Sequence, residues 1–98
     1  MLHDGIVVFV NERVDVIEVH KSARKHGLNN STIRALWVNW LEQCWLEDDS
    51  PGRVLRLCLD DAGRAFEVIG IVFDDDRVLV IHAMPLRQST LAILRRAR

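Results

Sequence analysis

"RVLRLCLDDAGRAFEVIGIVFDDDRVLVIHAM", residues 53–84, is the stretch that decides the fold. It contains three apolar runs of strand length, 53–60, 65–73 and 77–84, and the polar turns between them are short. Strands joined this tightly must be antiparallel neighbours, because a parallel pair needs a long crossover connection. The stretch therefore predicts an antiparallel β-meander.

The segment before the meander has the periodicity of a helix. Asn30 or Ser31 is the expected N-cap, and apolar residues then recur at helical spacing. These residues are Ile33, Leu36, Trp37, Trp40, Leu41 and Cys44. The pattern predicts one helix that carries the whole set, with Val38 and Trp45 on its flank and "EDDSPG" (47–52) ending it.

Nearer the N-terminus, "IVVFV" (6–10) predicts a β-strand. The segment 14–19 is compatible with a short strand or an irregular connection, and we expect a helix after it from about Glu18 to His26, ending at Gly27. After the meander, Pro85 is expected to end the last strand. A short basic helix over 88–98 then completes the chain.

This order of elements predicts an α+β fold, with an N-terminal strand and two helices, then the meander, then a C-terminal helix. The 98 residues form one domain, 1–98, and 49% of them are hydrophobic. In the first meander strand Leu55, Leu57 and Leu59 share a face, on which we expect the helices to pack. Arg56 then points to the opposite face.

Composition and charge suggest a cytoplasmic protein. The N-terminus lacks the basic start of a secretion signal, and its apolar run is too short to cross a membrane. Cys44 and Cys58 lie in apolar runs, which favours two reduced thiols over the alternative of a disulfide. The net charge is −1, but bases gather in 20–26 and 87–98 and form small basic patches.

The candidate chemistry lies on the last two meander strands. In a hairpin turning near residue 75, His82 pairs roughly with residue 68, which places Glu67 nearby and allows Arg56 to approach both. The alternative for His82 is a core histidine bonded to a backbone carbonyl. The alternative for Glu67 and Arg64 is an exposed ion pair of little energetic value.

Metal and nucleotide sites are not expected. His20 and His26 are six positions apart and so do not share one helix face. No metal-ligand or phosphate-binding motif is present. The alternative for the basic segment 20–26 is a solvated helix face.

Three segments and the basic end together resemble a toxin family. "VHKSARKHGLNNSTI" (19–33), "GRAFEV" (63–68) and "VIHAMPLR" (80–87) are similar in order and spacing to BrnT-type toxins of the RelE/ParE superfamily. These are the toxin halves of bacterial type II toxin–antitoxin pairs. The similarity covers residues 16–98, whereas the chain differs from many RelE-like nucleases in lacking tyrosine and in its slightly acidic charge.

The resemblance implies a RelE-like fold and a metal-independent mRNA endoribonuclease without a cofactor, acting on free or ribosome-bound RNA. Its partner would be a cognate DNA-binding antitoxin of ribbon-helix-helix or helix-turn-helix type. His82 would act as general base or acid, Arg64 and Arg87 would hold the phosphate, and Glu67 would orient His82 or take the first proton. Further RNA contacts would come from His20, Lys25, His26, Arg56, Arg95 and Arg96.

Two other functions fit the same sequence. One is a toxin without nuclease activity, such as a gyrase poison, for which the C-terminal arginines matter and His82 does not. The other is a protein-binding adaptor that uses Val38 and Trp45 as its partner surface, because exposed aromatic residues are typical interface anchors. Simple wrapping of the core is the alternative explanation for those two residues.

Overall fold

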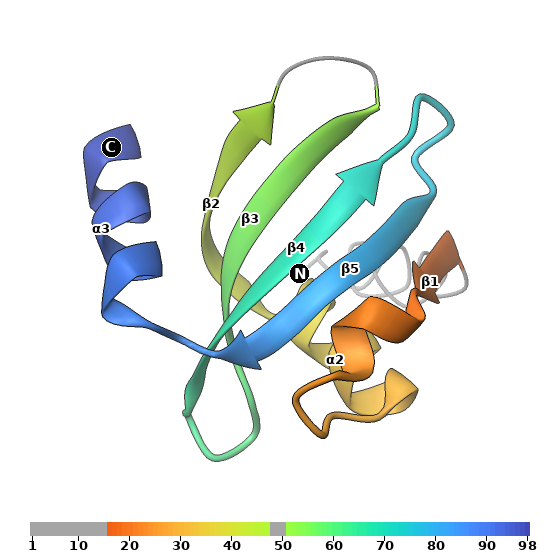
Figure 1. Cartoon of the computed structure of the whole chain (residues 1–98), viewed down its shortest axis with the longest axis horizontal. Coiled ribbons are helices and arrows are strands. Elements are labelled where there is room, and N and C mark those ends of the chain that lie inside the picture. Colours follow the sequence, from red (N-terminus) through yellow and green to blue (C-terminus); the bar gives the residue numbers. More distant parts are fainter. Residues whose placement is uncertain (1–15, 48–50) are drawn as a thin grey trace, which may run out of the picture.

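The computed structural model describes residues 16–47 and 51–98, which form a sheet of five strands with helices on both sides (Figure 1). The elements in chain order are β1 (Ile17–Val19), the 3₁₀ helix η2 (Lys21–Arg24), α2 (Asn30–Val38), β2 (Trp40–Glu47), β3 (Gly52–Leu59), β4 (Ala65–Val72), β5 (Val78–Pro85) and α3 (Gln88–Ala97). The fold is therefore α+β, as predicted. No helix among these residues is long and apolar enough to cross a membrane.

The sheet is mixed and has the strand order β1–β5–β4–β3–β2. The three antiparallel strands predicted from 53–84 are present as β3, β4 and β5, and Pro85 ends β5 as expected. The sheet is more than a simple meander, because β1 pairs with β5 in parallel and β2 extends the other edge. The strand predicted at 6–10 lies outside the described residues.

The long helix predicted to reach Cys44 is wrong. It ends at Val38, and Asn39 leaves the helical conformation with φ −96° and ψ 60°. The chain then runs as β2, in which Trp40 pairs with Cys58 and Cys44 pairs with Leu55. Apolar residues at mixed spacing satisfy a helical pattern by coincidence, while aromatic residues such as Trp40 favour a strand beside an available partner.

The helix predicted from Glu18 to His26 is also too long. Residues 17–19 form β1, and only Lys21–Arg24 are helical. His20 caps this turn by accepting the Ser22 backbone N–H at Nδ1 (3.1 Å), and the Ser22 hydroxyl donates to the Ile81 carbonyl (2.7 Å). These bonds fix η2 against β5, and the segment turns away at Gly27, whose φ of +86° suits glycine.

The helices lie on opposite faces of the sheet, so the expectation that they share one face is wrong (Figure 1). The α2 side chains Ile33, Leu36 and Trp37 pack on the face that carries Val54 and Cys58. Across the sheet, Leu55 and Leu57 pack with Leu94 of α3. The predicted row of leucines thus packs against the C-terminal helix α3, while α2 packs on the face from which Arg56 projects.

A β-bulge in β5 determines the position of His82. His82 pairs with Ile69 and Val80 pairs with Gly70, so Ile81 is the extra residue. The bulge reverses the alternation, because Val80 and Ala83 face α2 in the core while His82 shares the face of Ile69. Unbroken alternation would place His82 on the face of Val80, so the bulge is what brings His82 to the side of Glu67.

Candidate functional site

Glu67 is the centre of a polar cluster at the junction of β4, β5 and α3. Its side chain is only 1% exposed. His82 Nε2 lies 2.8 Å from Glu67 Oε2, and Arg87 Nη2 donates to the same oxygen at 2.7 Å. The Arg87 backbone N–H donates to Oε1 at 3.0 Å. We call Glu67, His82, Arg87 and Thr90 the Glu67 cluster.

Local structure explains why these residues meet. Glu67 projects from β4 toward the α3 side, His82 reaches that side through the bulge, and Pro85 turns the chain into α3. Arg87 is the N-cap of α3 but provides no capping hydrogen bond from its own side chain. The Glu67 carboxylate accepts the Arg87 N–H instead, and a negative charge at a helix N-terminus is stabilising.

The environment of Glu67 makes its carboxyl group strongly acidic. Burial alone raises the pKa of Glu67, but hydrogen bonds from Arg87, Thr90 and His82 outweigh burial and lower the pKa from 4.5 to about 2. A carboxylate this acidic is a poor proton acceptor at neutral pH. Of the two roles predicted for Glu67, the geometry favours orienting His82 over taking the first proton.

His82 is partly open to solvent, with 23% of its side chain exposed. Its Nε2 is bonded to the Glu67 carboxylate, so the alternative of a core histidine held by a backbone carbonyl is wrong. The other ring nitrogen, Nδ1, is not used in that bond. The exposed ring of His26 meets the His82 ring edge-on, with 5.9 Å between the centroids and 76° between the planes.

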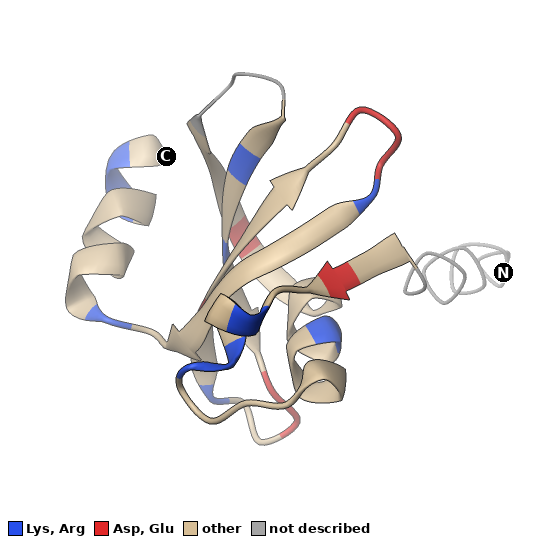
Figure 2. Ribbon diagram, turned by 45° about the vertical axis from the view of Figure 1, so that its right-hand side comes forward, with Lys and Arg blue, Asp and Glu red and all other residues tan. Residues whose placement is uncertain are grey.

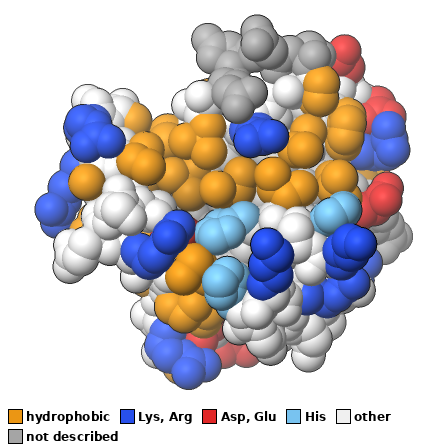
Figure 3. All heavy atoms as spheres, in the orientation of Figure 1, with side chains coloured by type: hydrophobic (Ala, Val, Ile, Leu, Met, Phe, Trp, Pro, Cys, Tyr) orange, Lys and Arg blue, Asp and Glu red, His pale blue; other side chains and the backbone are white. Residues whose placement is uncertain are grey.

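The surface around His82 is basic. Histidine side chains lie beside lysine and arginine side chains, below a band of hydrophobic residues (Figure 3). The exposed residues His20, Lys21 and Lys25 belong to η2 and its two ends, and contacts of η2 with β5 hold this segment near the site. Figure 2 shows the basic residues of this segment in front of the sheet. Two imidazoles and several cations thus share one surface.

Arg64 and the last arginines lie apart from the Glu67 cluster. Arg64 donates from Nε to Asp60 Oδ2 at 2.7 Å, and its side chain is 75% exposed. Its ion-pair partner is thus Asp60 and not Glu67. Arg95 and Arg96 lie in the last turn of α3. At 1.5 Å per residue, Arg95 is about 12 Å along the helix axis from Arg87.

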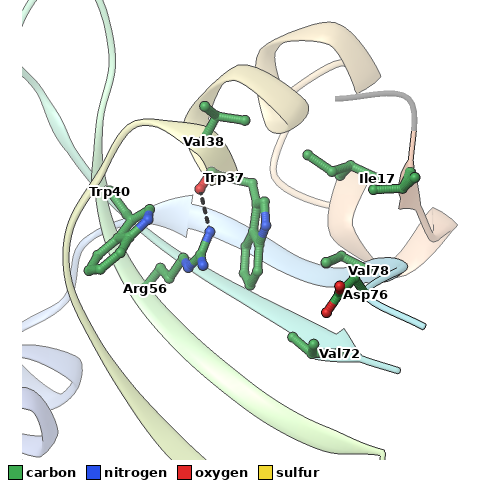
Figure 4. A pocket seen from close by; sticks show the side chains of 9 residues that line it. Ile17, Trp37, Val38, Trp40, Arg56, Val72, Asp76 and Val78 are labelled. Atoms are coloured by element: carbon green, nitrogen blue, oxygen red, sulfur yellow. Dashed lines mark hydrogen bonds between the residues drawn. The ribbon is translucent and has the colours of Figure 1, made fainter. Parts of the chain in front are cut away.

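Arg56 does not approach Glu67 or His82, and this prediction is wrong. Arg56 pairs with Val68 and therefore faces α2, on the opposite side of the sheet from Glu67. Its guanidinium carbon lies 3.9 Å from the centroid of the Trp37 ring and 4.9 Å from that of Trp40 (Figure 4). Successive side chains of a strand point to opposite faces of the sheet, so Arg56 and Glu67 lie on opposite faces.

Val38 and Trp45 do not share one helix flank. Val38 is half-buried at the end of α2, where it packs against the core. Trp45 belongs to β2 and is 56% exposed, like Leu41 at 61% on the same strand. Cys44 and Cys58 are both free, but only Cys58 is buried. The exposed aromatic surface is therefore the edge strand β2.

Sequence reasoning missed the part that Thr90 plays in the site. Thr90 was not among the predicted site residues, but it is 4% exposed and contributes a hydrogen bond to Glu67. A threonine three residues after Arg87, in the first turn of a helix that follows the histidine strand, was the available signal. Within 16–47 and 51–98, no three potential metal ligands come together.

The chain matches no protein-family model, no curated protein and no solved structure. The resemblance to the RelE/ParE superfamily rests on the segments 19–33, 63–68 and 80–87.

Proposed function

We propose that this protein is a metal-independent endoribonuclease and the toxin of a bacterial type II toxin–antitoxin pair of the RelE/ParE kind, acting in the cytoplasm. One observation carries the proposal. A partly exposed histidine is held by a buried carboxylate, with an arginine on the same carboxylate and a second imidazole beside it. These groups are of the kinds that RNA cleavage through the RNA's own 2′-hydroxyl uses, namely a base, an acid and a cation.

In this mechanism one imidazole removes the proton from the 2′-hydroxyl, and the oxygen attacks the adjacent phosphorus. The bond to the 5′-oxygen breaks, and the second imidazole protonates that leaving oxygen. The products are a 2′,3′-cyclic phosphate and a free 5′-hydroxyl. We assign the two proton-transfer roles to His82 and His26, because their rings are neighbours and imidazole can both accept and donate a proton.

Arg87 is suited to stabilise the charge that develops on the phosphorane. Its side chain is 54% exposed although Nη2 is bonded to Glu67, so the guanidinium reaches both the carboxylate and the solvent. Fixed donors aimed at developing charge are a major source of catalysis. Glu67 is a positioning residue here, since its hydrogen bond fixes the orientation of the His82 ring.

The test is cleavage of RNA by the purified chain and its His82→Ala variant. We expect the variant to lose at least about 100-fold in rate, the usual contribution of a general acid or base. Arg77→Gln is the control, because Arg77 lies in the turn before β5 and pairs with Asp75. Undiminished cleavage by a folded His82→Ala protein, or cleavage of RNA with 2′-deoxyribose at the scissile position, would exclude this mechanism.

The partner in this proposal is a small DNA-binding antitoxin of ribbon-helix-helix or helix-turn-helix type. The exposed residues Leu41 and Trp45 on the edge strand β2 support a protein partner, since an edge strand offers unpaired backbone groups and apolar anchors. Co-expression with the adjacent reading frame tests this. We expect growth arrest without that frame, and rescue together with a stable complex when it is present.

A purely protein-binding adaptor is the second candidate, and the same β2 surface favours it. The two functions differ in which variants matter. If the protein is an adaptor, Trp45→Ser removes its effect on cells and His82→Ala does not. If the protein is the nuclease, His82→Ala removes the growth arrest and Trp45→Ser does not. A toxin without nuclease activity would arrest growth with His82→Ala while leaving total RNA intact.

A further inference from the structure

A pocket lies on the α2 face of the sheet, on the opposite side from the Glu67 cluster. Its volume is about 340 Å³, which is within the range of small-molecule sites. Most of the residues around it are apolar or aromatic. The lining consists of Val16, Ile17, Trp37, Val38, Trp40, Arg56, Val72, Asp76 and Val78 (Figure 4).

Arg56 is the only cation in this lining, and its charge lacks an acidic partner among the described residues. Its Nε donates to the Gln43 side-chain oxygen (2.9 Å) and its Nη1 to the Trp37 carbonyl (2.8 Å), both neutral acceptors. Burial lowers the pKa of Arg56, which reflects the loss of water around the guanidinium. A partly desolvated cation without a counterion favours an anion nearby.

The two indoles restrict how an anion can approach Arg56. Trp37 and Trp40 lie against the guanidinium, so its flat faces are occupied by cation–π contacts (Figure 4). A guanidinium has five N–H donors in its plane, and the bonds to Gln43 and Trp37 use two of them. The remaining in-plane donors suit a carboxylate, which arginine binds through paired N–H groups.

The rest of the pocket defines the body and the total charge of the ligand. Val72 and Val78 line it beside the Trp37 indole, and Ile17 closes it from β1 (Figure 4). Asp76 lies on the other side of that indole from Arg56 (Figure 4). Arg56 is the one cation that the described residues contribute to the lining, so the site offers a partner for a single negative charge, which favours a monoanion over a phosphate dianion.

We propose that this pocket binds a small amphipathic monocarboxylate, with its carboxylate on Arg56 and its apolar body against Val72 and Val78. The site does not depend on the ribonuclease proposal, since neither Glu67 nor His82 lines it. The Arg56 side chain is thereby assigned to ligand binding instead of to the RNA phosphate backbone.

The probes are octanoate and 4-phenylbutyrate, each compared with its neutral primary amide. Titration of the isotope-labelled full chain, followed by NMR, should give saturable shifts of the Trp40 indole and of the Val72 and Val78 methyl groups. We expect the amides to bind at least tenfold more weakly than the acids. Equal affinities of acid and amide, no saturable binding at millimolar concentration, or shifts confined to other residues would each overturn the proposal.

Arg56→Gln provides the second arm of the experiment. It removes the charge, and we expect at least a tenfold loss of acid binding with little change in amide binding. Arg96→Gln, at the C-terminal end of α3, is the matched control and should bind the acids as the unaltered chain does. If Arg56→Gln fails to fold, the acid-to-amide comparison on the unaltered chain still decides the question.

Discussion

Among the described residues, each face of the sheet encloses a charged side chain, and the two side chains differ in their partners. On the α3 face, Glu67 is buried and is held by Arg87 and His82. On the α2 face, Arg56 is half-buried between two indoles and bonds only to neutral acceptors among the described residues. A carboxylate with its counterion joins three elements, whereas a guanidinium without one borders an open pocket.

This difference separates a structural function from a binding function. Removing Glu67 exposes unpaired partners on β5 and α3, so its loss affects both folding and the orientation of His82. Removing Arg56 leaves no acid unpaired among the described residues, so its loss affects the pocket more than the fold. The two faces therefore predict effects on stability of very different size, which can be measured.

Glu67→Ala should produce the largest loss of stability. It deletes the acceptor of the Arg87 side chain, the Arg87 backbone N–H and His82, and losing these hydrogen bonds to a buried carboxylate costs about 3 kcal/mol in the free energy of unfolding. Urea denaturation followed by circular dichroism measures the loss. Glu42→Ala, which removes the partner of the exposed Arg98 side chain, is the control and should hardly change the urea midpoint. Similar losses in both variants would contradict the contrast.

The second prediction concerns pH. Because the pKa of Glu67 is lowered from 4.5 to about 2 in the folded chain, its contribution to stability is complete above about pH 4.5. The contribution falls as the pH decreases toward 2, and 2.5 pH units correspond to about 3 kcal/mol. Urea unfolding between pH 6 and pH 2 measures this decrease. Glu67→Gln should weaken it over that range, and an unchanged pH dependence in this variant would show that other acids are responsible.

Gly70→Ala tests how tightly the α2 face is packed beneath the Arg56 pocket. An added Cβ at residue 70 would come within 2.8 Å of the Trp37 ring and 2.9 Å of Val78 Cγ1. Overpacking of this kind costs about 2 kcal/mol. The urea midpoint should fall, and the NMR signals of the Trp37 indole should shift. Gly63→Ala is the control for steric contact, because nothing lies within 4 Å of a Cβ there, although its φ of +78° still disfavours alanine.

Much of the fold was predictable from the sequence, because β3, β4 and β5 are apolar runs of strand length joined by short turns. The segment 40–47 was not predictable as a strand, since its apolar spacing fits a helix as well, and only pairing with β3 decides between them. The face of the sheet on which each helix packs was not predictable either. Because β3 is buried on both faces, the alternation of its side chains cannot assign α2 to one face.

The residues of the site were predictable, but their arrangement in space was not. Glu67, His82 and Arg87 were expected to act together, and they are in contact. His82 reaches Glu67 only through the bulge at Ile81, a one-residue irregularity that period-two reasoning does not detect. The same reasoning placed Arg56 near this group, and the regular alternation of β3 instead carries it to the other face.

Arg56→Met should have the smallest effect on stability, and it sharpens the contrast most. Methionine keeps an unbranched apolar chain beside Trp37 and Trp40 and removes a charge that has no acidic partner among the described residues. The lost cation–π contacts and the lost hydrogen bonds to Gln43 and to the Trp37 carbonyl are each worth about 1 kcal/mol, and relief from desolvating the guanidinium offsets most of that loss. Urea denaturation should therefore show a decrease well below that of Glu67→Ala. A loss as large as that of Glu67→Ala would mean that Arg56 is a structural anchor, and the distinction between the two faces would fail.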